Sequence, residues 1–507
     1  MPLAEIKAMS VFVLTFIATL IMFSLLFVYL PLQPVDEFCF TNINAAELII
    51  DGRSPSELRV SGFFVSHLIE FYHRFYPHMI FAVLSTVTGV KPDLLILWPA
   101  PIILAFLSLW LSLKIINASI FSRTLFVSLF VSTLSMNFFF EFYYISFGFS
   151  LFLLFAYLIL RYRNDESPIM IILWIMLFLA MAFSHYAAAV SAIVLLFLHR
   201  LRTRRLWLVV AFIAIFISLE VITYTQTSIQ IALFNMAHSS SQQIYFNLQK
   251  YFENLISTTS QPSAFIMVDP YFTNPIIQTA GSLNRIASIA YIVLTIIILY
   301  RSKNVNLFIR DVRFWFILSL YATGIVEVII YLLMNFGILQ RLTTIALLVL
   351  MAYLWPPTLI KNNQNKSVIC SFLAVIAVLL ATCLPILNFA RTYTFSLEYG
   401  TDYYDFCQKA NQPILFLLLH NGSLIYTDHY TDAILTYKAI HLNIKHSLQT
   451  VILKDELPAS NTGYFLLPSV KALRAGWSGH IPSSNFLPML IEGNVIYTSG
   501  SFQIYQY

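Results

Sequence analysis

Long uninterrupted runs of apolar residues recur along the first 388 residues of the chain, and short polar connections separate them. A helix needs roughly 20 residues to cross about 30 Å of hydrocarbon, and eleven runs come near that length. We therefore predict an α-helical multi-span membrane protein with about eleven transmembrane helices. The predicted spans cover residues 9–31, 94–116, 124–140, 147–160, 168–184, 186–198, 206–224, 286–300, 314–335, 342–359 and 368–388.

The composition supports a membrane protein. Of 507 residues, 59% are hydrophobic and only 10% are charged, and the mean hydropathy is +0.77. An ordinary soluble domain carries about 25% charged residues, so the polar side chains here are too few to cover a water-facing surface. A disordered chain, a collagen-like repeat and a small disulfide scaffold are excluded, and nucleic acid is not an expected partner. The four cysteines reveal no redox compartment, and whether Cys39 and Cys407 pair stays open.

The distribution of Lys and Arg predicts the orientation, because positive charge resists translocation. With a cytoplasmic N-terminus, the short inner connections hold 15 basic residues and the longer outer loops hold 7. The inner residues are Lys7, Lys114, Arg123, Arg161, Arg163, Arg200, Arg202, Arg204, Arg205, Arg301, Lys303, Arg310, Arg313, Lys361 and Lys366. The outer residues are Arg53, Arg59, Arg74, Lys91, Lys250, Arg285 and Arg341.

Three polar segments then lie outside the membrane: a first loop (32–93), a second long loop (225–285) and a C-terminal region (389–507). Long outer loops and short inner connections predict that the protein works at its outer face. Within the first loop, residues 77–90 are apolar but too few to cross the membrane, so we expect a helix lying in the interface that covers a cavity.

The C-terminal region has a different pattern, because runs of membrane-spanning length stop near Arg391. Short strands are predicted at 423–427 and 463–467, with a helix over 432–444. Residues 494–507 alternate as a hairpin. The region is therefore predicted to be a small extracytoplasmic α/β domain, following a transmembrane domain over 1–388. No internal repeat of fixed period is found, so a repeat-built transporter gains no direct support.

Candidate chemistry lies at the outer ends of the spans, since the chain has no Gly-rich phosphate loop and no HExxH, CxxC or GxSxG motif. Asp36 and Glu37 begin the first outer loop, and Glu141 follows the third span at the same predicted depth. Carboxylates at this level are suited to deprotonating a hydroxyl or holding a metal. Solvated acids at the membrane interface are the alternative.

Two further outer turns carry candidate binding residues. His185 and Tyr186 form the turn between the fifth and sixth spans, where a hydrogen-bonded structural histidine is the alternative. Arg341 is the basic residue of the turn between the ninth and tenth spans, and its guanidinium suits a phosphate. Arg74 and Lys91 flank the interfacial helix and add to the same anion site. Snorkelling of Arg341 to the interface stays open.

Two acids lie within predicted spans, where ionisable residues are functional suspects. Glu327 is the deeper one and is suited to proton coupling in a secondary transporter, while Glu220 lies nearer a span end. Each is also compatible with a neutral side chain hydrogen-bonded to a neighbouring span. A non-catalytic membrane scaffold with an outer binding domain is the third hypothesis.

Five short motifs taken together resemble the GT-C superfamily of integral membrane glycosyltransferases, which take a sugar from a polyprenyl phosphate carrier at the outer membrane face. Residues 75–90 are similar to the "HPP, apolar, Gly" stretch of the protein O-mannosyltransferase and aminoarabinose transferase branch, and residues 184–186 to the (S/T)HY turn of archaeal members. Two features depart from the family: Pro77-His78 replaces the double proline, and the WWD signature is absent, which argues against en bloc transfer to asparagine. The motifs are Val35-Asp36-Glu37, Phe75 to Val90, Ser184-His185-Tyr186, Arg341 and the terminal NVIYTSGSFQIYQY.

This resemblance implies an inverting glycosyltransferase of the cell membrane that uses a dolichyl-type phosphate sugar and a glycan, lipid or protein hydroxyl acceptor. It leaves the cofactor unknown, with a divalent metal still open, and membrane lipids are expected partners. The implied roles are catalytic base for Asp36 with Glu37 beside it, second acid for Glu141, donor-phosphate binding for Arg341 with Arg74 or Lys91, and substrate-cavity lining for His185, Tyr186 and His78.

Overall fold

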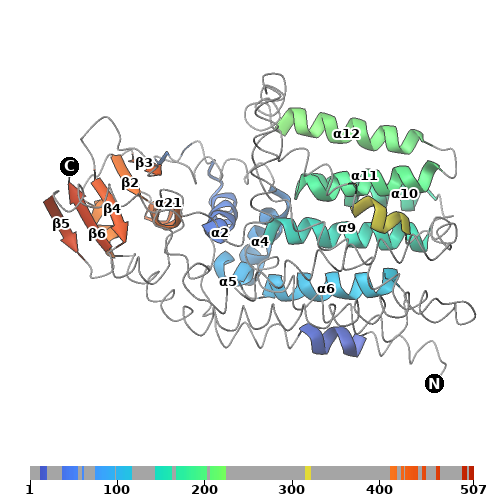
Figure 1. Ribbon diagram of the computed structural model, residues 1–507, viewed down its shortest axis with the longest axis horizontal. Helices are drawn as coiled ribbons and strands as arrows, with labels where there is room; N and C mark the ends of the chain where they lie inside the picture. The colour runs from blue at the N-terminus through green and yellow to red at the C-terminus, as the bar shows by residue number, and fades with distance from the viewer. Residues whose placement is uncertain are drawn as a thin grey trace, which may run out of the picture.

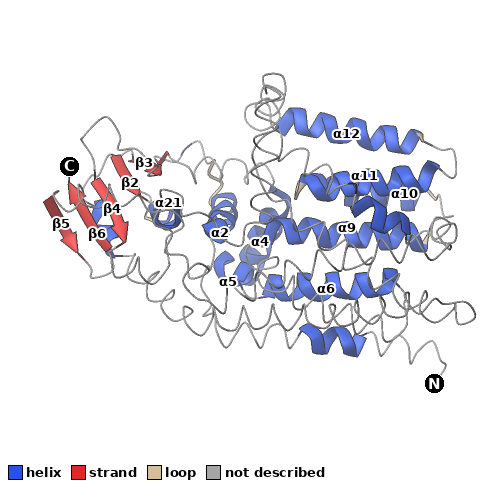
Figure 2. Ribbon diagram, in the orientation of Figure 1, coloured by secondary structure: helices blue, strands red, loops and turns tan. Residues whose placement is uncertain are grey.

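The described residues of the computed structural model form a helical bundle and a smaller α/β part and are mostly helical, as the apolar pattern predicts (Figures 1 and 2). Four predicted spans (124–140, 286–300, 342–359 and 368–388) and the second outer loop lie outside the described residues. The structure describes residues 12–19, 37–54, 57, 60–61, 75–97, 99–116, 143–162, 167–201, 206–223, 314–320, 322, 412–419, 424–427, 429–442, 448–452, 464–468, 494–498 and 502–506.

Within the described part of the chain, five long helices form the bundle, and they lie side by side in Figure 1. Each coincides with a predicted span, and α9 packs against α6, α10 and α11 while α12 packs against α10 and α11. Proline at the first turn of α10 suits a helix start, because that turn has no intrahelical partner for its N–H groups. The helices are α6 (Pro99–Ile116), α9 (Tyr143–Arg161), α10 (Pro168–Ala182), α11 (Tyr186–Leu201) and α12 (Trp207–Thr223).

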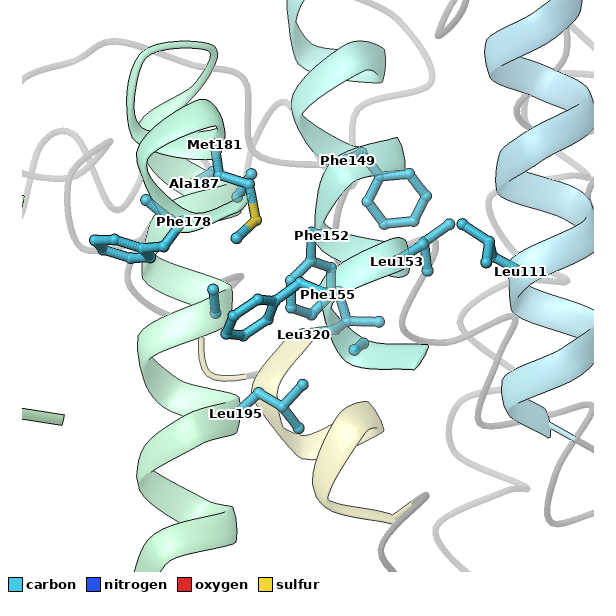
Figure 3. Packing of buried hydrophobic residues seen from close by; sticks show 14 of the residues in the cluster. Leu111, Phe149, Phe152, Leu153, Phe155, Phe178, Met181, Ala187, Leu195 and Leu320 are labelled. Carbon is cyan, nitrogen blue, oxygen red and sulfur yellow. The ribbon is translucent and has the colours of Figure 1, made fainter. Parts of the chain in front are cut away.

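The core of the bundle lies around α9. Its Phe152 and Phe155 are almost fully buried, and Figure 3 shows Leu153 of α9 facing Leu111 of α6. Two further segments join this core: ring centroids of Phe152 and Phe316 lie 5.7 Å apart, which packs helical residues 314–320 on α9. Residues 12–19 pack on α6 through a ring contact of Phe12.

The outward positions of the bundle are also apolar. Ile169 is 77% exposed, Val210 64% and Met176 63%. Within the described residues, one helical stretch, Pro92–Ile116, is long and apolar enough to cross a membrane. The number of about eleven spans therefore stays a prediction. The other apolar helices found in the same residues are shorter: Ser146–Arg161, Pro168–Ala182, Ala187–Arg200 and Trp207–Leu219.

Three helices lie at one end of the bundle: two from residues 32–93, the predicted first loop, and one that begins there and continues into the predicted span 94–116. They are α2 (Glu37–Ile50), α4 (Phe75–Thr88) and α5 (Pro92–Leu97). Helix α4 matches the predicted interfacial helix, whereas α2 was not predicted. The rings of Tyr76 and Phe147 lie 6.0 Å apart, so α4 contacts the first turns of α9. Gly89 ends α4 with φ +70°, a conformation that favours glycine.

The α/β part is a six-stranded mixed sheet with order β1-β3-β2-β4-β6-β5. The pairs β1–β3, β3–β2 and β2–β4 are parallel, and β4–β6 and β5–β6 are antiparallel. Helix α21 (His429–His441) connects the parallel strands β2 and β3, as such strands require a crossover. The strands are β1 (Val60–Ser61), β2 (Leu424–Thr427), β3 (Leu448–Ile452), β4 (Tyr464–Pro468), β5 (Asn494–Thr498) and β6 (Phe502–Gln506).

The sheet includes a strand, β1, from a part of the chain that was predicted to lie outside the α/β domain. The hairpin of β5 and β6 is confirmed, and β2, β4 and α21 lie within one to three residues of their predicted bounds. However, β1 comes from the first outer loop, with Val60 opposite Leu448 of β3. The sheet is therefore not built from residues 389–507 alone.

Candidate functional site

Helix α2 is the layer between the bundle and the α/β part (Figure 1). It contacts α4, α5 and α9 and also α21. Ala45 and Leu48, both 0% exposed, form an apolar cluster with Ile440 of α21. The first outer loop is thus the surface on which the α/β part rests.

The predicted acid pair lies at the start of this layer. Glu37 is the first residue of α2, and Asp36 precedes it but lies outside the described residues, as does the side chain of Glu37. Glu220 lies on α12, and its side chain is likewise not described. The roles predicted for these acids therefore stay predictions. Other candidates outside the described residues are Arg74, Glu141, Glu327 and Arg341.

His78 lies in the contact between α4 and α2. It is fully buried, and its Nε2 lies 2.8 Å from Oδ1 of Asn42, which is also 0% exposed. Because an amide oxygen only accepts hydrogen bonds, Nε2 is the donor. This bond joins the two helices about 8 Å along α2 from Glu37, at 1.5 Å per residue. His78 thus joins α4 to the half of α2 that begins at Glu37, and its predicted place in a cavity wall stays a prediction.

His185 occupies the predicted turn between α10 and α11. Its backbone N–H donates to the carbonyl of Met181 at 2.8 Å, and the residue is 3% exposed. A Cβ added at Gly148 of α9 would lie 3.0 Å from Cβ of His185, so glycine allows this close helix contact. Since Phe147 contacts α4, His185 and His78 lie at the same end of the bundle. Tyr186 begins α11, and its side chain is not described.

Lys91 lies in the link between α4 and α5 and is exposed. His78 is near the start of α4, and Lys91 follows its last residue, Thr88, so about 15 Å of helix separates His78 from the end that Lys91 follows. The two residues belong to opposite ends of α4. An exposed ammonium beside an apolar helix is suited to a lipid phosphate at the membrane surface, which keeps the predicted role of Lys91 open.

A group of titratable side chains at the junction of α2, α5 and α21 was not predicted. Nδ1 of His441 lies 3.0 Å from Oε2 of Glu47, and the rings of His441 and Tyr437 lie 4.4 Å apart. Burial raises the pKa of the Tyr437 hydroxyl, and the carboxylates of Glu47 and Asp93 raise it further because they oppose a second negative charge. The sequence signal is weak: Glu47 is a single acid inside the apolar run NAAELII.

A metal remains an open question at this end of the bundle. Among the described residues, no group of three or more His, Cys, Asp or Glu side chains is arranged to hold a metal ion. The predicted acids Asp36 and Glu141 are outside that part of the chain.

Comparisons with protein-family models and with curated proteins gave no match. The resemblance to GT-C enzymes therefore rests on the short motifs.

Proposed function

We propose that the protein spans the membrane with about eleven helices, a cytoplasmic N-terminus and an outer α/β domain. The exposed apolar side chains of the bundle support this, because lipid tails take the place of water there. The last turns of three helices carry basic residues, Lys114, Arg161 and Arg200, as inner ends should. The α/β part lies at the opposite end of these helices (Figure 1).

We further propose that the protein is a glycosyltransferase acting at this outer end. The observation that carries the proposal is the position of α2: it begins at Glu37 and packs between the bundle and the α/β part. Membrane-facing and water-facing portions of the protein meet there. A lipid-carried donor and a water-borne acceptor need a site that is open to both the lipid and the water.

The proposed reaction is a single displacement. The acceptor hydroxyl oxygen attacks the anomeric carbon, a new carbon–oxygen bond forms, and the bond from that carbon to the carrier phosphate breaks with inversion. The hydroxyl proton passes to the carboxylate of Asp36, and the electron pair of the broken bond leaves on the polyprenyl phosphate. Arg341 stabilises the phosphate charge that develops, with Glu37 and Glu141 near the reacting centre.

The donor class follows from the layout of the chain. A sugar nucleotide is water-soluble and requires a nucleotide-binding region on the cytoplasmic face, whereas the predicted inner connections are short. A polyprenyl monophosphate sugar is lipid-soluble and reaches the outer end within the bilayer. The exposed ammonium of Lys91 is available to contact the carrier phosphate, as the proposal requires.

The test uses the full-length protein reconstituted in lipid with a panel of radiolabelled polyprenyl-phosphate sugars. Asp36→Asn keeps the side-chain size and removes its basicity, so we expect transfer to fall by about 10²- to 10⁴-fold. Asp51→Asn, the same change at an exposed position of the same loop, is the matched control and should keep full activity. Efficient transfer from a sugar nucleotide without lipid carrier, or native rates in Asp36→Asn, would contradict the proposal.

A further inference from the structure

The contact between α2 and α21 joins segments far apart in the sequence. Its centre is apolar, with Ala45 and Leu48 against Ile440. At its edge, Nδ1 of His441 lies 3.0 Å from Oε2 of Glu47, and these side chains are 40% and 18% exposed. One polar contact thus borders a small apolar patch. The apolar patch by itself does little to fix the register of the two helices, because the hydrophobic effect is not directional.

The side chains around His441 restrain this polar contact. The Tyr437 ring lies 4.4 Å from the imidazole and limits its rotation. The other charged groups described nearby are Asp93 on α5, whose carboxylate acts on Tyr437, and Lys438, whose Nζ is 5.6 Å from the Tyr437 ring. A partly buried pair is screened less by salt than an exposed surface pair.

Helix α2 transmits any displacement at this contact to the start of the first loop. Ten residues separate Glu47 from Glu37, which is about 15 Å along one helix. Catalytic groups misplaced by about 1 Å can lose 10²-fold in rate. A shift of α2 at Glu47 therefore matters at the acid pair, although neither Glu47 nor His441 reaches the reacting atoms.

We propose that Glu47 and His441 are positioning residues: they hold α21 of the α/β part in register on α2, and they thereby fix the acid pair at the start of α2. The catalytic consequence rests on the proposed glycosyltransferase function, whereas the docking of α21 on α2 does not. This gives the α/β part a role in the reaction that requires no catalytic residue of its own.

The experiment uses full-length protein in lipid nanodiscs. Glu47→Gln, His441→Asn and the double variant are compared with Asp51→Asn, which removes a carboxylate from the exposed turn just after α2. Amide hydrogen exchange is measured over α2 and α21, with α9 as internal reference. The kcat for transfer and the KM for the lipid-linked donor are measured in the same samples.

We expect each single variant to speed exchange over α21 and α2 by about 3- to 10-fold, the worth of one partly buried polar contact. The double variant should add little, because both changes remove the same contact. The kcat should fall by a similar factor with KM unchanged, and Asp51→Asn and α9 should not respond.

Two results would overturn the proposal. Exchange over α21 and α2 equal to that of the native protein would show that the pair does not hold the helices. Faster exchange with an unchanged kcat would show a contact without a positioning role. A native protein with no transferase activity would instead remove the proposed function, and the exchange rates alone would then decide whether the pair holds α21 on α2.

Discussion

The helical bundle and the α/β part both bury apolar side chains, but among the described residues exposed apolar side chains are more numerous in the bundle. In the bundle, Ile169 and Met176 are exposed, while Ser108 and Ser150 are buried and share a hydrogen bond of 2.7 Å between their hydroxyls. In the sheet, the strand β2 carries buried Ile425 and Tyr426, as expected for strands packed beneath a helix.

This difference is the one expected if the bundle lies in lipid and the α/β part lies in water, as we propose. A water-facing surface of exposed isoleucine, valine and methionine would aggregate, whereas the same surface in lipid has no such cost. Inside a membrane bundle, packing depends on close contact and interhelical hydrogen bonds, since apolar burial gives little net gain there. The sheet still depends on burial from water.

Substituting arginine for an exposed apolar residue in each region should give the largest difference in effect between the bundle and the α/β part. Met176→Arg places a charge at the middle of α10 and should cost about 2.5 to 3.5 kcal/mol of insertion free energy. Val495→Arg, on the edge strand β5 where Val495 is 48% exposed, should change stability by less than about 0.5 kcal/mol. Carbonate extraction of membranes and size-exclusion chromatography in detergent measure the effect. Equal behaviour of the two variants would refute a lipid-facing α10.

Variants of Gly148 test whether close packing between helices stabilises the bundle. Gly148→Leu forces a branched side chain into the 3.0 Å approach to His185, and overpacking of this kind costs about 1 to 3 kcal/mol. Gly148→Ala should fall between the native protein and the leucine variant, because its one added carbon requires a shift of a few tenths of an ångström. Thermal unfolding in detergent checks both. A leucine variant as stable as the native protein would mean that α9 and α11 are not tightly packed.

The variant Tyr437→Phe tests the junction between the bundle and the α/β part. We expect it to have the smallest effect on stability of the three tests. Its folded pKa is raised, so the folded state keeps the proton more firmly and stability falls as pH rises above about 10, the usual pKa of tyrosine. The fall is at most about 1.4 kcal/mol per pH unit, reduced by solvent because the side chain is only half-buried. Chemical denaturation followed from about pH 8 to about pH 11 should show a shallower fall for Tyr437→Phe. If the native protein and Tyr437→Phe lose stability with pH at the same rate, Tyr437 does not contribute to the pH dependence.

Local patterns in the sequence predict much of this fold. The five long bundle helices, α4, α21 and the β5–β6 hairpin each follow from periodicity or turn residues within about 20 neighbouring positions. Strand β1 could not be predicted, because two residues carry no strand pattern and their partner Leu448 lies at the other end of the chain. The pairing of Glu47 with His441 was missed for the same reason. For Asp36, Glu141 and Arg341, the sequence remains the source of the predicted roles.

The pairing of β1 with β3 sets an order of events during synthesis. Val60 leaves the ribosome long before its partner Leu448, and at about 5 to 20 residues per second the delay is on the order of 20 to 80 s. Through that interval β1 has no strand to pair with, and the contact face of α2 has no α21. The sheet and the contact between α2 and α21 are therefore completed last, after most of the chain has been made.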